Sequence, residues 1–104
     1  MKVIELTKDN FDKEIVESNQ VVLIDFWASW CVPCKMLSPV VDEVADENPL
    51  IKVCKVNVDK EPELADAFNV SSIPMLAVVK DKKVAKVSVG VIPKEEILKM
   101  IKES

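Results

Sequence analysis

Two cysteines three positions apart, Cys31 and Cys34, are the residues of this chain best suited to chemistry. They lie between an apolar run at 21–26 and a segment, from Met36 onward, whose apolar residues recur at helical spacing. The pair is therefore expected where a buried strand passes into the first turn of a helix. The unpaired N–H groups and positive dipole end of that turn stabilise a thiolate, so Cys31 is expected to be the acidic, reactive thiol.

The spacing of these cysteines also allows them to form a disulfide of normal geometry, so the pair can alternate between dithiol and disulfide. Pro33 is tolerated between them because the N–H groups of a first helical turn have no partner. Cys34, one turn inside the helix, is expected to be the more buried and the less acidic thiol.

Histidine is absent, which excludes Cys-His nucleophile pairs, Ser-His triads and mixed Cys/His zinc sites. A zinc module built from Cys31, Cys34, Cys54 and a carboxylate is an alternative from a different functional class. The cysteine spacing argues against such a zinc module, because there is no second Cys-x-x-Cys and Cys54 falls within a predicted strand. Cys54 is expected to be an inert, buried thiol, and no metal site is predicted.

The composition limits the remaining function classes. A chain of 104 residues with 49% hydrophobic content is expected to form one domain, 1–104, with a modest core. The net charge is −4, and all 14 basic residues are lysine without a basic cluster, which makes nucleic acid a poor partner. The charged N-terminal segment and the lack of a membrane-length apolar run predict a cytoplasmic protein with no membrane partner.

The elements that must position the cysteines follow from the spacing of the apolar residues. Strands are predicted over 2–6, 21–26, 51–58, 75–80 and 84–89. Helices are predicted around 11–16 with Phe11, Ile15 and Val16 inward, from the cysteine pair to Asn48-Pro49, through 59–69 with Asp59 as cap, and over 93–102. This order predicts an α/β fold, a mixed five-stranded sheet with parallel crossovers, one hairpin at 81–83 and helices on both faces.

Asp25 is the most informative residue outside the cysteine pair. It is the one carboxylate in the apolar run, where its ionised form is costly and burial should raise its pKa. Trp27 is assigned to packing near the cysteines, and Met36, Met75 and Met100 to the core.

The chain resembles the thioredoxin family over about 3–102. The resemblance is carried by Asp25, the run WCVPCK at 30–35, Pro39, Ile73-Pro74 and the single glycine, Gly90, before the last helix. This combination is far more specific than Cys-x-x-Cys alone. It implies the thioredoxin fold and a thiol-disulfide oxidoreductase that reduces protein disulfides.

The resemblance also implies roles for individual residues. Cys31 attacks a substrate disulfide, Cys34 resolves the mixed disulfide, and Asp25 accepts the proton of Cys34. Lys55 matches the family's lysine partner of that aspartate, and the alternative is that Asp25 and Lys55 form a structural ion pair. No cofactor beyond the disulfide is implied. The implied partners are protein disulfide substrates and a thioredoxin reductase, and the chain is expected to be a monomer.

Five residues are implied to bind substrate: Trp30, Ile73, Pro74, Gly90 and Val91. With Val32, they would surround the cysteines with apolar surface, and Gly90 would allow close approach of a substrate. Ile73-Pro74 resembles a cis-proline loop whose backbone binds an extended segment, although a proline at the start of a strand is the ordinary alternative.

Three residues are assigned to tuning the redox couple: Val32, Pro33 and Lys55. Thioredoxins usually carry glycine where this chain has Val32, which changes helix propensity by only a few tenths of a kcal/mol and does so in both redox states. A small shift in potential is therefore expected. A disulfide oxidase or isomerase of the same fold is an alternative that usually requires export. A catalytically inactive interaction domain is another, opposed by the presence of both cysteines, Pro33 and Asp25.

Overall fold

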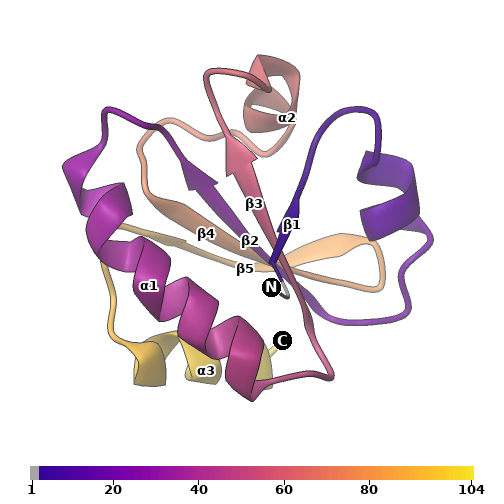
Figure 1. The fold of residues 1–104 in the computed structure, drawn as a ribbon. Coiled ribbons are helices and arrows are strands. Elements are labelled where there is room, and N and C mark those ends of the chain that lie inside the picture. The colour runs from indigo at the N-terminus through magenta and orange to yellow at the C-terminus, as the bar shows by residue number, and fades with distance from the viewer. Residues whose placement is uncertain (1–2) are drawn as a thin grey trace.

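A five-stranded mixed sheet separates two layers of helices (Figure 1). The computed structural model describes residues 3–104. The strands are β1 (Val3–Glu5), β2 (Val22–Trp27), β3 (Lys52–Asn57), β4 (Met75–Lys80) and β5 (Lys83–Val89). The helices are the short π-helix η1 (Asp12–Val16), α1 (Val32–Glu47), α2 (Pro62–Ala67) and α3 (Lys94–Lys102).

The strand order is β1-β3-β2-β4-β5, with β2 at the centre. β3 runs parallel to β1 and β2, whereas β4 pairs antiparallel with β2 and β5. The predicted order of elements and the mixed sheet are confirmed. Residues 22–26 of β2 are all buried, as an apolar run in a central strand requires.

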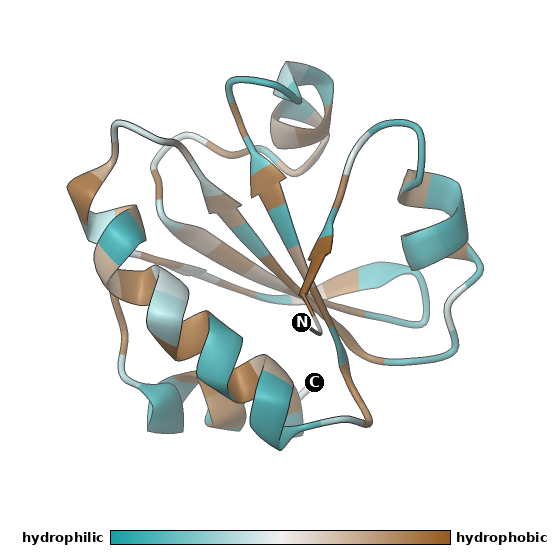
Figure 2. Cartoon of the chain, viewed as in Figure 1, coloured by the Kyte–Doolittle hydropathy of each residue, from teal (hydrophilic) through white to brown (hydrophobic). Residues whose placement is uncertain are grey.

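Each face of the sheet has its own core. α1 and α3 cover one face, where the core includes Leu23, Leu37, Val41, Val53 and Ile97. η1 and α2 cover the other, where it includes Ile15, Ile24, Phe26, Val56 and Leu64. Figure 2 shows the resulting amphipathic pattern of α1 as alternating hydrophobic and hydrophilic bands. The prediction of helices on both faces is confirmed.

Met36 was expected in the core, and this expectation is wrong. Its side chain is 61% exposed, whereas α1 buries Cys34, Leu37 and Val41. α1 begins at Val32, one turn before the apolar spacing becomes visible, and Met36 lies on the other side of this first part of the helix. Met75 is buried in the core, as predicted.

Several predicted boundaries also differ from the structure. The first strand was expected from Lys2, which lies outside the described residues. Val16 of η1 is partly exposed rather than inward. α2 begins at Pro62 after Glu61, so Asp59 does not cap it. Over residues 3–104, no helix combines the length and apolar character needed to cross a bilayer.

β5 carries an apolar strip that the sequence did not reveal. Val84, Val87 and Val89 pair with β4 residues that face the η1 and α2 layer, yet all three are exposed. β5 is an edge strand, and its Lys83 and Lys86 disfavour edge-to-edge pairing with a second copy. The monomer therefore remains a prediction.

The turn between β4 and β5 is tighter than expected and contains no glycine. Lys80 pairs with Lys83, which leaves a two-residue turn of Asp81 and Lys82. Their φ angles are 51° and 67°, the left-handed values of a type I′ turn. A residue with a Cβ atom in this region loses about 1 kcal/mol relative to right-handed backbone.

We predict that Lys82→Gly raises the free energy of unfolding by about 0.5–1 kcal/mol, because glycine adopts positive φ without a steric cost. Chemical denaturation of the oxidised protein measures this change. Lys83→Gly is the matched control, since Lys83 lies in β5 and glycine weakens a strand. Equal effects of the two substitutions would contradict the account of the turn.

Candidate active site

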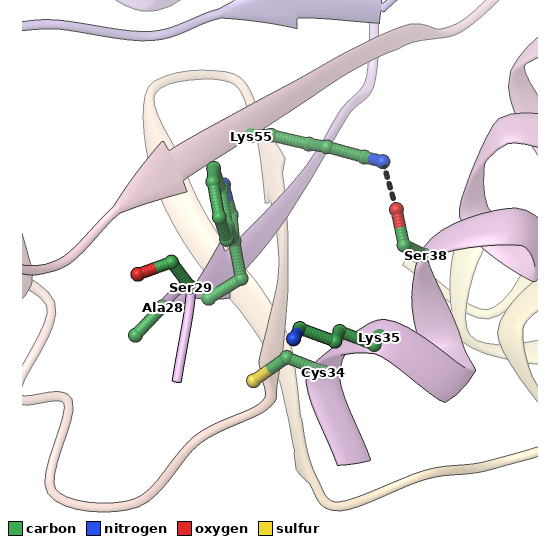
Figure 3. Close-up of a pocket in the computed structure, with 7 residues that line it drawn as sticks. Ala28, Ser29, Cys34, Lys35, Ser38 and Lys55 are labelled. Carbon is green, nitrogen blue, oxygen red and sulfur yellow. Dashed lines mark hydrogen bonds between the residues drawn. The ribbon is translucent and has the colours of Figure 1, made fainter. Parts of the chain in front are cut away.

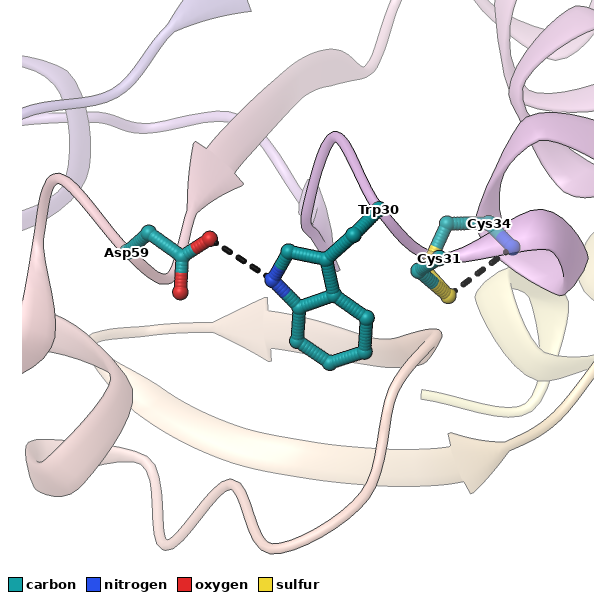
Figure 4. Close-up of a disulfide and its surroundings, with 4 residues drawn as sticks. All are labelled: Trp30, Cys31, Cys34 and Asp59. Carbon is teal, nitrogen blue, oxygen red and sulfur yellow. Dashed lines mark hydrogen bonds between the residues drawn. A yellow bond between two sulfur atoms is a disulfide. The ribbon is translucent and has the colours of Figure 1, made fainter.

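Cys31 and Cys34 form a disulfide at the N-terminus of α1 (Figure 4). Cys31 is the N-cap residue in extended backbone, and Pro33 lies in the first turn, as predicted. The Cα atoms of the two cysteines are 5.2 Å apart. The expected position, where a strand passes into a helix, is therefore confirmed.

The two sulfur atoms differ in hydrogen bonding more than in burial. Both cysteines are buried, Cys34 only marginally more than Cys31. The backbone N–H of Cys34, however, donates to Cys31 Sγ at 3.2 Å. When the disulfide is reduced, this N–H and the positive end of the α1 dipole favour negative charge on the Cys31 sulfur.

The loop that precedes β4 completes the surroundings of the disulfide. Ile73 packs against the cluster formed by the two cysteines and Ala28, and the Ile73-Pro74 peptide bond is cis, as the resemblance implies. The N–H of Gly90 donates to the Pro74 carbonyl at 2.8 Å and so joins this loop to the end of β5. Gly90 has φ 98°, which favours glycine, and the space that a Cβ atom would enter is open.

Exposed apolar side chains lie on the segment that carries the disulfide. Trp30 is 66% and Val32 65% exposed, and Met36 is also exposed. Val91, which follows Gly90 after β5, is exposed as well. The indole Nε1 of Trp30 donates to Asp59 Oδ2 at 2.8 Å, which holds an exposed ring beside the cysteines (Figure 4). Asp59 and Met36 were not predicted as site residues, since nothing in the sequence links Asp59 to Trp30 across 29 positions.

Asp25 is buried in β2 on the face covered by α1. Its side chain is 1% exposed, and neither carboxylate oxygen has a hydrogen-bond partner within residues 3–104. Burial raises the pKa of Asp25 from 3.8 to about 6, because the charged form loses its hydration. Lys55 opposes this rise of the pKa and Asp42 adds to it.

Lys55 does not form an ion pair with Asp25, which was the structural alternative for these two residues. Its Nζ donates to Ser38 Oγ at 2.6 Å and lies 2.8 Å from Asp42 Oδ1. Ser38 and Asp42 were not predicted as site residues. Their spacing from Cys34, at four and eight positions, places all three on one face of α1 and is the signal that could have identified them.

A small cavity of about 160 Å³ opens beside Cys34 (Figure 3). It is lined by Trp27, Ala28, Ser29, Cys34, Lys35, Ser38 and Lys55. This volume exceeds the space that one water molecule requires. The position of Trp27 agrees with its assignment to packing near the site.

Cys54 is separate from the redox pair. It is buried in the core beneath η1 and α2, and burial raises its pKa to about 12. Cys31 and Cys34 lie at the N-terminus of α1, which covers the opposite face of the sheet. The three cysteines of the alternative zinc site are therefore not brought together. Over residues 3–104, no group of three or more histidine, cysteine or acidic residues could hold a metal ion.

Comparison with known proteins agrees with this geometry. The family model described as Thioredoxin matches residues 2–103. A thioredoxin from Chlorobaculum thiosulfatiphilum is 45% identical over 98% of this chain and 95% of its own length. A thioredoxin from Buchnera aphidicola is 41% identical over 99% of this chain and 96% of its own. A putative thioredoxin 2 from Streptomyces coelicolor is 43% identical over 94% of this chain and 72% of its own.

We predict that Asp25→Asn stabilises the oxidised protein at pH 8 by about 3 kcal/mol, because the folded-state pKa of Asp25 lies about two units above the unfolded value. Because folding raises the pKa of this carboxyl group, the protonated Asp25 contributes its full stabilisation of the folded protein below the unfolded pKa of 3.8. This stabilisation is lost as the pH rises through the folded pKa of about 6. The increase in unfolding free energy produced by Asp25→Asn should therefore vanish near pH 4. Denaturation of both proteins at pH 4 and pH 8 measures it.

Asp46→Asn is the matched control, because Asp46 lies exposed on the same helix as the cysteines. It should change the unfolding free energy by less than about 0.5 kcal/mol at either pH. A gain from Asp25→Asn of the same size at pH 4 and pH 8 would contradict the raised pKa.

Proposed function

Because the chain belongs to the thioredoxin family and is a protein-disulfide reductase, we propose that Cys31 is its nucleophile, Cys34 its resolving thiol and Asp25 the proton acceptor of Cys34. The observation that carries this assignment is the N–H of Cys34 donating to Cys31 Sγ. It distinguishes the two sulfurs by favouring charge on one of them.

The proposed cycle is two thiol-disulfide exchanges. The Cys31 thiolate attacks one sulfur of a substrate disulfide, so that a Cys31–substrate disulfide forms and the other substrate sulfur leaves as a thiolate. Cys34, once deprotonated, attacks Cys31 Sγ and releases the second substrate sulfur. The substrate gains two electrons and two protons, and the protein ends with the Cys31–Cys34 disulfide seen in the structure.

Asp25 has the properties of a base for the second exchange. Its carboxylate has no hydrogen-bond partner within the described residues, and a pKa of about 6 leaves it ionised at neutral pH while it remains able to take a proton. The cavity beside Cys34 has room for water, and Lys55, the cross-strand neighbour of Asp25, lines it.

The substrate surface is proposed to consist of Trp30, Ile73, Pro74, Gly90 and Val91. Exposed apolar side chains around a reactive sulfur suit an extended or unfolded protein segment. The open space at Gly90 and the backbone of the Ile73-Pro74 loop suit strand-like docking of that segment beside the disulfide. Val32 and Met36 extend the apolar surface on α1.

Recycling by a thioredoxin reductase in the cytoplasm completes the proposal. Membership of the family supports disulfide substrates and such a reductase as partners. The Cys31–Cys34 disulfide is proposed as the sole redox centre, without a bound cofactor. Val32 and Pro33, both exposed in the first turn of α1, are proposed to tune the couple together with Lys55.

Cys34→Ser should trap a mixed disulfide between Cys31 and a disulfide-containing protein such as insulin, because the resolving thiol is lost. Non-reducing electrophoresis and mass spectrometry measure the adduct. Cys31→Ser is the matched control and should form none. Adducts of equal yield from the two variants would contradict the assignment of the nucleophile.

Asp25→Asn should slow resolution of the mixed disulfide at pH 7 by at least tenfold, because the proton of Cys34 loses its acceptor. In the parent protein the resolution rate should rise as the pH passes about 6, where Asp25 becomes ionised. Stopped-flow fluorescence of Trp27 and Trp30 measures this step. The acceptor role of Asp25 is excluded if the two proteins resolve at the same rate across this pH range.

A further inference from the structure

Three polar or reactive side chains form a row along α1 above the sheet. Cys34, Ser38 and Asp42 follow one another at intervals of four residues and therefore share a face of the helix. Lys55 reaches this row from β3. Its Nζ lies 2.6 Å from Ser38 Oγ (Figure 3). It also lies 2.8 Å from Asp42 Oδ1, so it is held at two points of α1.

The same lysine is the cross-strand neighbour of Asp25. The two residues are Cα partners in the parallel pairing of β2 with β3, and both side chains project toward α1. Asp25 is nevertheless left without a hydrogen-bond partner within residues 3–104. The ammonium that the register places beside Asp25 is thus bound to α1 instead.

We propose that Ser38 is a positioning residue that, together with Asp42, holds the Lys55 ammonium on α1 and so keeps the Asp25 carboxylate unpaired. This inference rests on the proposed role of Asp25 as the proton acceptor of Cys34. An ammonium in contact with Asp25 would stabilise its ionised form and make it a weaker base. Ser38 therefore helps Asp25 to remain a stronger base, although Ser38 makes no hydrogen bond to Asp25.

Few charged groups face Asp25, which makes its titration simple to interpret. β3 contributes Lys55, and α1 contributes Asp42 and, in the reduced protein, the thiol of Cys34. β4 contributes the apolar Leu76, the Cα partner of Asp25 on that side. In the oxidised protein Cys34 does not titrate.

The test is the titration of the Asp25 side-chain carboxyl by ¹³C NMR in the oxidised protein. Ser38→Ala removes the hydroxyl that accepts from Lys55, and the midpoint of Asp25 should fall by about one pH unit as the ammonium moves toward it. Ser38→Thr restores a hydroxyl and should restore the parent midpoint. Ser29→Ala is the matched control, because Ser29 lines the same cavity from the loop after β2 and should leave the midpoint unchanged.

A second background tests whether the effect passes through Lys55. In Lys55→Met protein, Ser38→Ala should produce no shift of the Asp25 midpoint, because there is no ammonium to release. An unchanged midpoint in the single Ser38→Ala variant, or an equal shift in both backgrounds, overturns the proposal.

This readout is independent of the proposed catalytic role. If Asp25→Asn leaves resolution of the mixed disulfide unchanged, the acceptor role fails, while a midpoint shifted by Ser38→Ala still establishes the positioning of Lys55. If Asp25→Asn slows resolution and the midpoint does not move in Ser38→Ala, the acceptor role stands and the positioning role of Ser38 fails.

Discussion

The hydrogen bond from the Cys34 amide to the Cys31 sulfur depends on where α1 begins. Only at the start of a helix does an N–H lack a partner within the helix and become free to bond a side chain. Cys31 in the N-cap position takes the place of the usual serine or aspartate, so the group that caps the helix is also the group that reacts. The disulfide, its polarity and its location at one end of the sheet all follow from this position.

A second constraint is the burial of a carboxylate in the central strand. Asp25 costs stability in its ionised form, since the surrounding residues of β2 are apolar and buried and neither oxygen is hydrogen-bonded within the described chain. A protein selected for stability alone would place an apolar residue here. The cost is understandable if the site requires a base beside Cys34, and the binding of Lys55 to α1 keeps that base from being neutralised by its nearest cation.

Much of this architecture could be predicted because it rests on local signals. The apolar run of β2, the spacing of α1 residues and the position of the cysteine pair each follow from periodicity within one segment. Met36 was misplaced because helical spacing alone does not distinguish a side chain that faces the core from one that faces a functional surface. The partners of Lys55 and Trp30 could not be predicted, because each contact joins different elements and depends on side-chain direction. The hairpin turn was predicted one residue too long, over 81–83, because Asp81 and Lys82 lack the glycine that normally marks positive φ.

The central claim is that the Cys31–Cys34 pair acts as a reductant, and its equilibrium redox titration in dithiothreitol and glutathione buffers tests this most directly. Val32 is 65% exposed, so it has few contacts through which it could favour one redox state. The account predicts a potential more reducing than that of the glutathione couple, with the pair remaining a disulfide in buffers set at that potential. A pair that remains a dithiol in those buffers would contradict the account and identify an oxidising couple.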